Sequence, residues 1–509
     1  MLNDLQLDEF IYEQPALGDT EFTFKHALTQ EVTYNSVLVE RRKRLHEKVG
    51  QALESMFAGQ LEDHLDQLAN HYSRGTDPVK AIEYLGRAGQ QALRRSAYTV
   101  SINRFSEAIH LLQKTPESPE RNQRELLLQL ALAAAFAIKG GWGLPEVEGA
   151  YARARELCEQ LGNPPEFFPA LNGLWAMRAL RGELPSAHVL AEQLLHRAQA
   201  TGDSPLLMYA HYALGFTSFW KGEFLTARKH LETASKLYSF PEHRSLIHLY
   251  GFDAGVHSLS YAAWTLWHLG YPDQAIERGN EAVDLARRLS HPESLTFALS
   301  SFAAAHQSRR ETAQTQANAQ KAIDLAAEYG LMEVWPIVTS LCGWAMAARG
   351  CRAEGIAHLE ETLNPGATRG SNLAIPYILL LLVDAYKEAG RLEEMQSTLR
   401  QAFASVDERD AHSHEAEMIR LKGELLSIQD DSAAARAQNC FRKAIEVAQR
   451  QGAKSWELRA TTSLARLLRD TGRRDEACAI LAEIYNWFTE GFDTADLKDA
   501  KALLDELRA

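Results

Sequence analysis

Two segments of the chain carry ring side chains at the spacing of one helix face, and such a row can bind a ligand. The intervals are three, four or seven residues, which bring side chains onto the same side of a helix. The residues are Tyr209, Tyr212, Phe216 and Phe219 in the first segment and His257, Trp264 and Trp267 in the second. A wall of rings can stack on a sugar or hold the apolar side chains of a peptide. The same spacing is typical of helices that fill a hydrophobic core, so both interpretations stay open.

No motif in the sequence points to bond-making chemistry. Gly140, Gly141 and Gly143 form a cluster, but the lysine and hydroxyl residue of a nucleotide-binding P-loop do not follow them. His412 and His414 are two residues apart and diverge on a helix, so we expect a solvated helix start there and not a metal site. The sequence therefore predicts a chain that is not an enzyme and has no catalytic residue, metal ligand or cofactor of its own.

The composition is that of an ordinary soluble chain. Of 509 residues, 46% are hydrophobic and 24% are charged, and the formal net charge is −13. This acidic balance argues against binding to nucleic acid or to an anionic membrane surface. The five cysteines form no C-x-x-C pair, and the most apolar stretch, Leu126 to Ile138, is too short to span a membrane. With no signal peptide visible, we expect reduced thiols and a cytoplasmic protein.

Beyond residue 60 the sequence alternates long helical periods with short breaks, and the breaks repeat. A glycine marks most of them, and successive glycines lie about 40 residues apart or about twice that distance. The glycines are Gly182, Gly222, Gly270, Gly350, Gly390 and Gly472. Each doubled interval conceals one further unit, with breaks expected near residues 307–309 and 430–431. A repeat of this length indicates stacked pairs of helices, with a left-handed glycine between the two helices of a pair.

Small and apolar residues occupy the positions where paired helices must approach each other. After Gly222 come Ala227, Leu231 and Ala234 on one helix face, and a Leu-Gly pair ends at Gly215 in the preceding helix. This pattern resembles the tetratricopeptide repeat (TPR) over roughly residues 60–490. The resemblance implies an all-α fold, a right-handed α-solenoid whose first helices line a concave face. It also places the two aromatic segments on that face, as a surface for a protein, a peptide or a small ligand.

The first residues have a different pattern, that of two short strands and a helix. Phe10–Tyr12 and Phe22–Phe24 flank a turn expected at Gly18–Asp19, and a long charged amphipathic helix follows to about Val49. An isolated hairpin is marginal in water and needs something to pack on. The pattern therefore predicts a winged-helix remnant that consists of the wing and a connecting helix.

Four longer segments carry a further resemblance. They are LQLDEFIYEQP, FTFKHALTQEVTYNSVLVERRKRLHEKVGQALE, ARAQNCFRKAIEVAQRQGAKSWELRATTSLARLL and NWFTEGFDTADLKDAKALLDEL. They resemble the C-terminal regions of bacterial STAND-class signalling ATPases, of the type fused to a class III adenylate or guanylate cyclase. The resemblance implies the order cyclase, P-loop ATPase, winged helix and repeats, of which the chain holds only the end. ATP and ADP then belong to a full-length relative, whose ATPase domain is an intramolecular partner of this region.

The same resemblance gives His26 a role that depends on an ATPase domain. In this family a winged-helix histidine near this place faces the nucleotide phosphate, to which an imidazole can donate a hydrogen bond. The alternative is a histidine at a helix start that packs locally, and this interpretation holds for the chain by itself.

These patterns divide the chain and predict its function. The expected parts are a partial winged helix (1–57), first TPR-like helices (58–115), the solenoid (116–490) and a C-terminal capping helix (491–509). We expect a non-catalytic sensor arm of a signal-transduction ATPase that binds a ligand or partner on its concave face. The alternative is a free-standing scaffold for assembling proteins, and an enzyme hidden in the helical array ranks last. If the aromatic wall binds, Trp264→Ala weakens binding and leaves the fold intact, whereas loss of the fold makes Trp264 a core residue.

Overall fold

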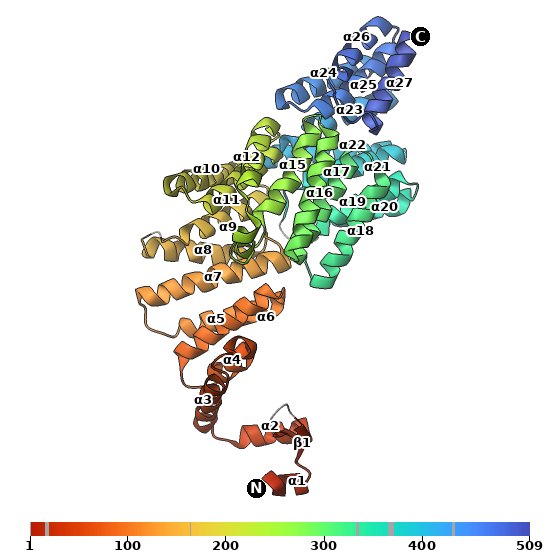
Figure 1. Ribbon diagram of the computed structural model, residues 1–509. Coiled ribbons are helices and arrows are strands. Elements are labelled where there is room, and N and C mark those ends of the chain that lie inside the picture. Colours follow the sequence, from red (N-terminus) through yellow and green to blue (C-terminus); the bar gives the residue numbers. More distant parts are fainter. Residues whose placement is uncertain (1, 16–19, 163, 332–334, 365–370, 430–432) are drawn as a thin grey trace. The chain divides into compact units, whose positions relative to one another are not determined.

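The computed structural model describes residues 2–15, 20–162, 164–331, 335–364, 371–429 and 433–509 (Figure 1). The chain divides into two compact units. The N-terminal unit comprises residues 1–92 and 100–121, and the repeat unit comprises residues 93–99 and 122–509. The finer division expected from the sequence, at residues 57, 115 and 490, stays a prediction.

The first part of the chain contains one hairpin and a series of helices. Its elements are α1 (Leu2–Leu7), β1 (Ile11–Pro15), β2 (Thr20–Phe24), α2 (Ala27–Ser36), α3 (Val39–Met56), the 3-10 helix η1 (Leu61–His64), α4 (Leu65–Ser73), α5 (Pro78–Arg94) and α6 (Tyr98–Leu112). The two strands pair antiparallel, with Ile11 opposite Phe24. The pairing confirms the predicted hairpin, and the turn expected at Gly18–Asp19 lies outside the described residues.

The long helix expected after the hairpin is two helices. α2 ends at Ser36 and α3 begins at Val39, because Val37 and Leu38 are extended, with ψ of 130° and 137°. The Ser36 hydroxyl donates to the carbonyl of Thr33 at 2.7 Å, and such local bonds compete with continuation of a helix. The hydrophobic pattern of the sequence runs across this break and does not reveal it.

The repeat unit is a series of paired helices, which confirms the predicted α-solenoid (Figure 1). The helices that follow α6 are α7 (Pro119–Gly140), α8 (Pro145–Gln160), α9 (Phe167–Leu180), α10 (Leu184–Thr201), α11 (Ser204–Trp220), α12 (Phe224–Leu237), α13 (Phe240–His243), η2 (Arg244–Leu246), α14 (Ile247–Tyr250), α15 (Ala254–His268), α16 (Pro272–Leu289), α17 (Pro292–Ser308), α18 (Thr312–Tyr329), α19 (Trp335–Ala348), α20 (Arg352–Thr362), α21 (Ile375–Glu388), α22 (Leu392–Arg409), η3 (His412–His414), α23 (Glu415–Gln429), α24 (Ala434–Gln451), α25 (Lys454–Asp470), α26 (Arg474–Tyr485) and α27 (Ala495–Arg508). The tightly packed pairs are α9–α10, α11–α12, α15–α16, α17–α18, α19–α20, α21–α22, α23–α24 and α25–α26. Each pair also packs on the next, so neighbours cover the apolar face that a pair cannot bury alone.

The turns between paired helices have the backbone conformation that the repeat pattern predicts. All six marker glycines have positive φ, from 70° at Gly390 to 106° at Gly350. At the break expected near residues 307–309, Arg310 takes this role with φ of 62°, and the break near 430–431 lies outside the described residues. Within the α11–α12 pair, a Cβ atom on Gly215 would lie 2.6 Å from Leu231 Cγ, so the helices approach too closely there for a side chain.

One interval between glycines is longer because an irregular segment separates α12 from α15. Residues 238–253 contain the short helices α13, η2 and α14. α14 packs against α9, and Tyr250 stacks on Tyr209 of α11 with 3.8 Å between the ring centroids. The segment thus adds aromatic side chains, including Phe252, to those that α9 and α11 supply.

Helices near the C-terminus pack back against the middle of the repeat unit. The Ser455 hydroxyl of α25 donates to the carbonyl of Trp267 in α15 at 2.5 Å, across 188 residues of sequence. Arg459 Nη2 donates to the carbonyl of Ser308 in α17 at 2.6 Å, across 151 residues. These bonds join helix pairs that are not neighbours in the repeat order.

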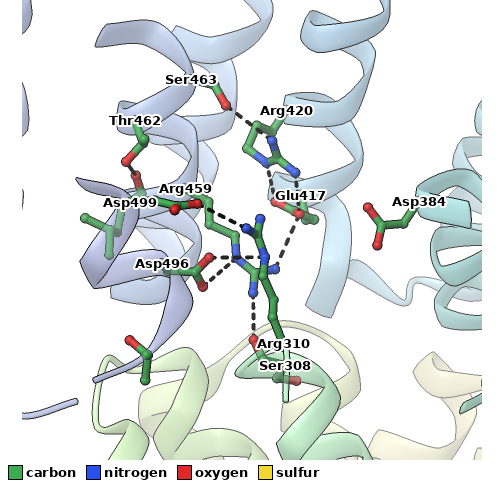
Figure 2. Close-up of polar contacts among 12 residues, drawn as sticks. Ser308, Arg310, Asp384, Glu417, Arg420, Arg459, Thr462, Ser463, Asp496 and Asp499 are labelled. Carbon is green, nitrogen blue, oxygen red and sulfur yellow. Dashed lines mark hydrogen bonds and ion pairs between the residues drawn. The ribbon is translucent and has the colours of Figure 1, made fainter. Parts of the chain in front are cut away.

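A network of charged side chains lies at this contact (Figure 2). Arg420 makes two hydrogen bonds to Glu417, of 2.6 and 2.7 Å, and Arg459 Nε donates to Asp496 Oδ2 at 2.8 Å. Arg310 also pairs with Asp496, at 3.3 Å. Burial by itself raises the pKa of Glu417, but the guanidinium groups of Arg420 and Arg459 outweigh it and hold the pKa below its usual value. Charged groups of α23, α25, α27 and the α17–α18 turn are therefore held together.

The last helix, α27, covers the end of the helical core. Its buried residues are Leu497, Ala500, Leu503, Leu504 and Leu507. They pack with apolar residues of α25 and α26. A helix at the end of a repeat array needs such a two-sided character, with one apolar and one polar face.

Candidate functional site

A cavity of about 70 Å³ lies inside the repeat unit and is lined mainly by aromatic rings. By this measure one water needs about 10–15 Å³, so the cavity has room for several non-hydrogen atoms. Its ring side chains come from α9, α11, α15, α17 and the segments before α8 and α15. They are Trp142, Trp175, Tyr212, Phe216, Trp220, Phe252, His257, Tyr261 and Phe297. Pro336, Ile337, Ser371, Leu373 and Ala374 complete the lining together with small and apolar residues of α9.

The rings around the cavity hold one another in edge-to-face contacts. Trp175 meets Tyr212 and Phe216 at interplanar angles of 82° and 84°, with centroid distances of 5.6 and 5.5 Å. Phe216 meets Tyr261 at 4.7 Å. Contacts of this kind stabilise aromatic clusters beyond the effect of buried area. The wall of the cavity is therefore preformed.

Two of the three indole N–H groups of the wall, those of Trp175 and Trp220, are occupied within the protein. Trp175 Nε1 donates to the Thr217 hydroxyl at 3.1 Å, and Trp220 Nε1 donates to the Tyr261 hydroxyl at 3.2 Å. Because these donors have partners, the two tryptophans offer the cavity apolar ring surface. The polar contribution to the lining comes from other groups, among them His257 and Ser371.

Three of the seven aromatic residues proposed from the sequence meet at this cavity, and four lie elsewhere. Tyr212, Phe216 and His257 line it. All seven side chains are buried, and the remaining four lie within the packed core of the repeat unit. Tyr209 donates to the carbonyl of Phe252 at 3.1 Å and stacks on Tyr250, Phe219 stacks on Trp264, and Trp267 packs on Trp456. The binding role of the seven residues stays a prediction.

His26 belongs to the N-terminal unit. It stands directly before α2, where its backbone is extended and its exposed side chain makes no capping hydrogen bond. The nucleotide-sensing role, which requires an ATPase domain, stays a prediction.

The two rows proposed from the sequence are the ring residues among the positions 13, 10, 6 and 3 before the turn glycines Gly222 and Gly270, and this count missed several wall residues. Trp175, Trp220 and Tyr261 each stand one residue from a counted position, which is about 100° around a helix. Applied to Gly182, the same count selects Ala176 and Ala179, which do line the cavity. One sequence signal could have located the cavity. It is a helix with small residues at its inner positions, followed by a helix with rings at the opposite positions.

His257 connects the cavity to a buried carboxyl group. Its Nδ1 lies 3.1 Å from the Tyr212 hydroxyl, and its Nε2 lies 3.3 Å from Glu293 Oε1. Phe297 stacks on the imidazole with a centroid distance of 3.6 Å. His257 and Glu293 are each only 4% exposed. Burial lowers the pKa of His257 to about 3, so the ring is neutral at physiological pH.

A second buried acid, Asp253, lies beside this pair. Its carboxylate accepts from the Val256 N–H at 2.8 Å as the cap of α15, and from the Tyr238 hydroxyl at 3.0 Å. Burial raises the pKa of Asp253 to about 6 and also raises the pKa of Glu293 well above its usual value. Across the described ranges, no lysine or arginine forms an ion pair with either acid.

Replacing Glu293 by glutamine is expected to remove a pH dependence of stability. The pKa of Glu293 is raised in the folded state, so as pH rises above about 4.3 the unfolded chain releases its proton first. The wild type then loses stability with rising pH, by up to about 1.4 kcal/mol per pH unit, until the folded state ionises too. Glutamine cannot ionise, so the variant does not show this loss.

Urea unfolding from pH 5 to 7 measures the effect, with the exposed Glu281→Gln as the control. Equal pH slopes in wild type and Glu293→Gln would contradict this assignment.

Contacts between distant segments lie next to the cavity lining. Leu373 N donates to the carbonyl of Leu180 at 3.0 Å, which ties the residues before α21 to the end of α9. Arg409 Nε donates to the carbonyl of Asn372 at 3.1 Å. Arg181, which follows Leu180, pairs with Glu148 at 2.8 Å. These bonds hold segments that line the cavity, or border its lining, in place.

Two further findings concern metals and membranes. Where side chains are described, no group of three or more His, Cys, Asp or Glu residues is arranged to hold a metal ion. His414 is buried against Trp456 and Tyr377, so the solvated helix start expected at His412 and His414 is wrong for His414. Among the helices described, none combines the length and apolar character needed to cross a bilayer.

The fold and the cavity together define the class of this protein, an α-solenoid of TPR-like helix pairs with an aromatic cavity in its repeat unit. No protein-family model matches the chain. An uncharacterized protein of Rhizobium meliloti (strain 1021) is 22% identical over 454 residues, which make up 88% of this chain and 44% of that protein. The chain thus spans less than half the length of this curated relative.

Solved structures of helical repeat proteins resemble the chain in fold. The Rap protein complexed with competence and sporulation factor has a TM-score of 0.51 at 12% identity, and the alignment covers 77% of this chain and all of that one. The human IFIT1 dimer with PPP-AAAA scores 0.43 at 14% identity, covering 88% and 99% of the two chains. Yeast Tom70 scores 0.35 at 13% identity, covering 91% and 97%. Only the first score supports a shared architecture, and at this identity it shows the fold alone.

Proposed function

We propose that the repeat unit is a non-catalytic binding arm that takes a small ligand, or a side chain of a protein partner, into the aromatic cavity. The observation that carries this proposal is the preformed wall of rings, in which the indole donors of Trp175 and Trp220 are already occupied within the protein. A concave, mostly apolar site with a few polar groups is the usual form of a small-ligand site. The cavity offers this combination, with His257 as a polar group in an aromatic wall.

We further propose that this arm serves a larger signalling protein, a STAND-class ATPase linked to an adenylate or guanylate cyclase. The sequence segments that resemble this class support the proposal, as does a relative more than twice as long as the matched region. In the N-terminal unit, α2, α3 and the residues between them expose several large apolar side chains that suit contact with another domain. They are Leu28, Val32, Leu38, Val39 and Met56. Ligand binding would shift an ATPase switch only if the ligand has different affinities for the two states of the switch.

The same exposed apolar residues also suit the alternative, a scaffold that assembles separate proteins. The reading frame upstream of the chain separates the two proposals. A P-loop in frame with this sequence supports the signalling ATPase. A stop codon directly upstream of Met1, with no ATPase coding sequence joined to it, supports the scaffold.

Replacing Phe297 by alanine is expected to weaken ligand binding at least tenfold, because it removes the ring that stacks on His257 in the cavity wall. A suitable ligand is found by screening compounds for an increase in melting temperature, since a ligand of the folded state stabilises it. The affinity is then measured by calorimetry.

Phe302→Ala is the matched control for this experiment. Phe302 lies on the same helix, is also partly buried, and is absent from the cavity wall. We expect its replacement to leave the affinity within a factor of about two, well under 1 kcal/mol. Equal losses of affinity in the two variants would contradict binding in the cavity.

A further inference from the structure

We propose that the cavity binds a small organic cation, such as a quaternary or alkyl ammonium compound. This inference rests on the proposed binding function and names the chemistry of its ligand. Three features of the described residues support it: the number of tryptophan rings, the lack of a competing cation in the wall, and two buried acids behind the wall.

The first feature is the ring content of the wall. Trp142, Trp175 and Trp220 are among the lining residues, and indole gives the strongest attraction between a cation and a ring face. The N–H edges of Trp175 and Trp220, which carry positive partial charge, are directed to protein acceptors. With these edges occupied, the ring surface that remains for a ligand includes electron-rich parts of the two indoles.

The second feature is that no lysine or arginine lines the cavity within the part of the chain that the structure describes. The arginines next to the cavity lining are held by other groups. Arg181 pairs with Glu148 at 2.8 Å, and Arg409 pairs with Glu408 at 2.7 Å while it donates to the carbonyl of Asn372. A cationic ligand therefore does not have to displace a resident positive charge.

The third feature is a pair of buried acids that lack a cationic partner. Glu293 Oε1 lies 3.3 Å from Nε2 of His257, which lines the cavity, and Asp253 lies beside that pair. A positive charge in the cavity favours the ionised form of both acids, as an ion-pair partner does. Binding is then coupled to release of a proton, and it strengthens as pH rises. The other titratable groups that interact with Glu293 are His291, at 3.7 Å, and Tyr98.

The burial of the wall favours a small free molecule over a side chain on a partner. Except for Phe297, the aromatic side chains of the wall are buried, and the bond from Leu373 N to the carbonyl of Leu180 joins two segments that line the cavity. A small molecule can reach buried rings through a brief local opening, whereas a polypeptide also needs a path for its chain. We therefore expect the cation to come without an attached chain.

The test compares choline with 3,3-dimethyl-1-butanol, a neutral compound of nearly the same shape, by calorimetry on the full chain. We expect choline to bind at least tenfold more tightly, and its affinity to rise several-fold between pH 6 and pH 8, while the affinity for the alcohol stays constant. Measurements in buffers of different ionisation enthalpy are expected to show proton release with choline only. In Glu293→Gln the pH dependence is expected to weaken, because only Asp253 is left to titrate, and in the exposed Glu281→Gln it should persist in full.

Equal or tighter binding of the alcohol would overturn the cation inference and leave the cavity as an apolar binding site. Choline binding that does not change with pH or with Glu293→Gln would also overturn it, because the buried acids would then play no part. Tighter binding of a short peptide that carries trimethyl-lysine would overturn the choice of a free small molecule. If neither choline nor the alcohol binds, the cation inference is overturned. The comparison of Phe297→Ala with Phe302→Ala then still tests the proposed function.

Discussion

Replacing Arg459 by alanine is expected to lower the free energy of unfolding by about 3–5 kcal/mol, the range found when one partner of a buried ion pair is removed. The side chain is 8% exposed and holds three elements together. Its guanidinium donates to Asp496 and to the carbonyl of Ser308, and it pairs with Glu417 at 3.5 Å (Figure 2). It also lies over the rings of Trp267 and Trp456, at 5.0 and 4.9 Å from their centroids.

The loss follows from what stays behind after the substitution. Glu417 keeps Arg420, but Asp496 keeps only the more exposed Arg310, and the carbonyl of Ser308 loses its donor. Buried charges and acceptors without partners are costly because water cannot replace the missing group.

The matched control is Arg469→Ala in the same helix. Arg469 is more exposed and pairs with the exposed acids Asp470 and Glu506, so its loss should cost below about 1 kcal/mol. Because repeat arrays unfold in parts, urea unfolding is combined with hydrogen exchange in α17 and α25. Similar losses for Arg459→Ala and Arg469→Ala, or unchanged exchange in α17, would contradict a structural role for this network.

Replacing Trp264 by alanine is expected to cost about 3–5 kcal/mol of stability, as for other large buried aromatic residues. Trp264 is 5% exposed and packs on four rings. They are Phe219, Trp220, Tyr261 and Tyr377, at centroid distances of 5.4, 6.1, 5.8 and 5.7 Å. Its removal would leave a space that rigid neighbours cannot fill.

A second substitution separates packing from the indole N–H. Trp264 Nε1 is buried and has no hydrogen-bond partner in the described structure. Trp264→Phe keeps most of the ring and removes this unsatisfied donor, so it should cost clearly less than alanine. Trp487→Ala, at a tryptophan that is 37% exposed, is the control for loss of an indole near the surface.

The same experiment judges the binding role that the sequence suggested for Trp264. Trp264 lies outside the cavity wall and within the packed core, so we assign it a packing role. With this role, Trp264→Ala lowers the melting temperature, and the protein that stays folded binds the ligand with unchanged affinity. Weaker binding with an unchanged melting temperature would instead support the original prediction. Both quantities are obtained from one thermal titration with and without ligand.

The architecture could be predicted because its signals are local in the sequence. Gly222 takes the left-handed conformation that ends the first helix of a pair, and Gly215 permits the close approach of Leu231. Both effects involve residues within about one repeat, so periodicity and residue size suffice to find them. The break between α2 and α3 was not predicted, because the extended backbone at Val37 does not change the hydrophobic pattern of the sequence.

The cavity could be predicted only in part because its wall is assembled from distant residues. Counting from the glycines found Tyr212, Phe216 and His257, which belong to regular helix pairs. Phe252 comes from the irregular segment before α15, and Leu373 reaches the cavity through its bond to Leu180. No spacing rule in the sequence connects residues 180 and 373, so this side of the cavity required the structure.

The return contact between α25 and the middle of the repeat unit constrains how this array could change in evolution. Open arrays can gain or lose repeats because each repeat touches only its neighbours. Here Ser455 must reach the carbonyl of Trp267, and Gly491 N must reach Asp273 at 2.9 Å. Duplication or deletion of one helix pair between α17 and α23 would shift every one of these partners out of reach. The number of pairs in that interval is therefore fixed, and natural length variation should fall outside it.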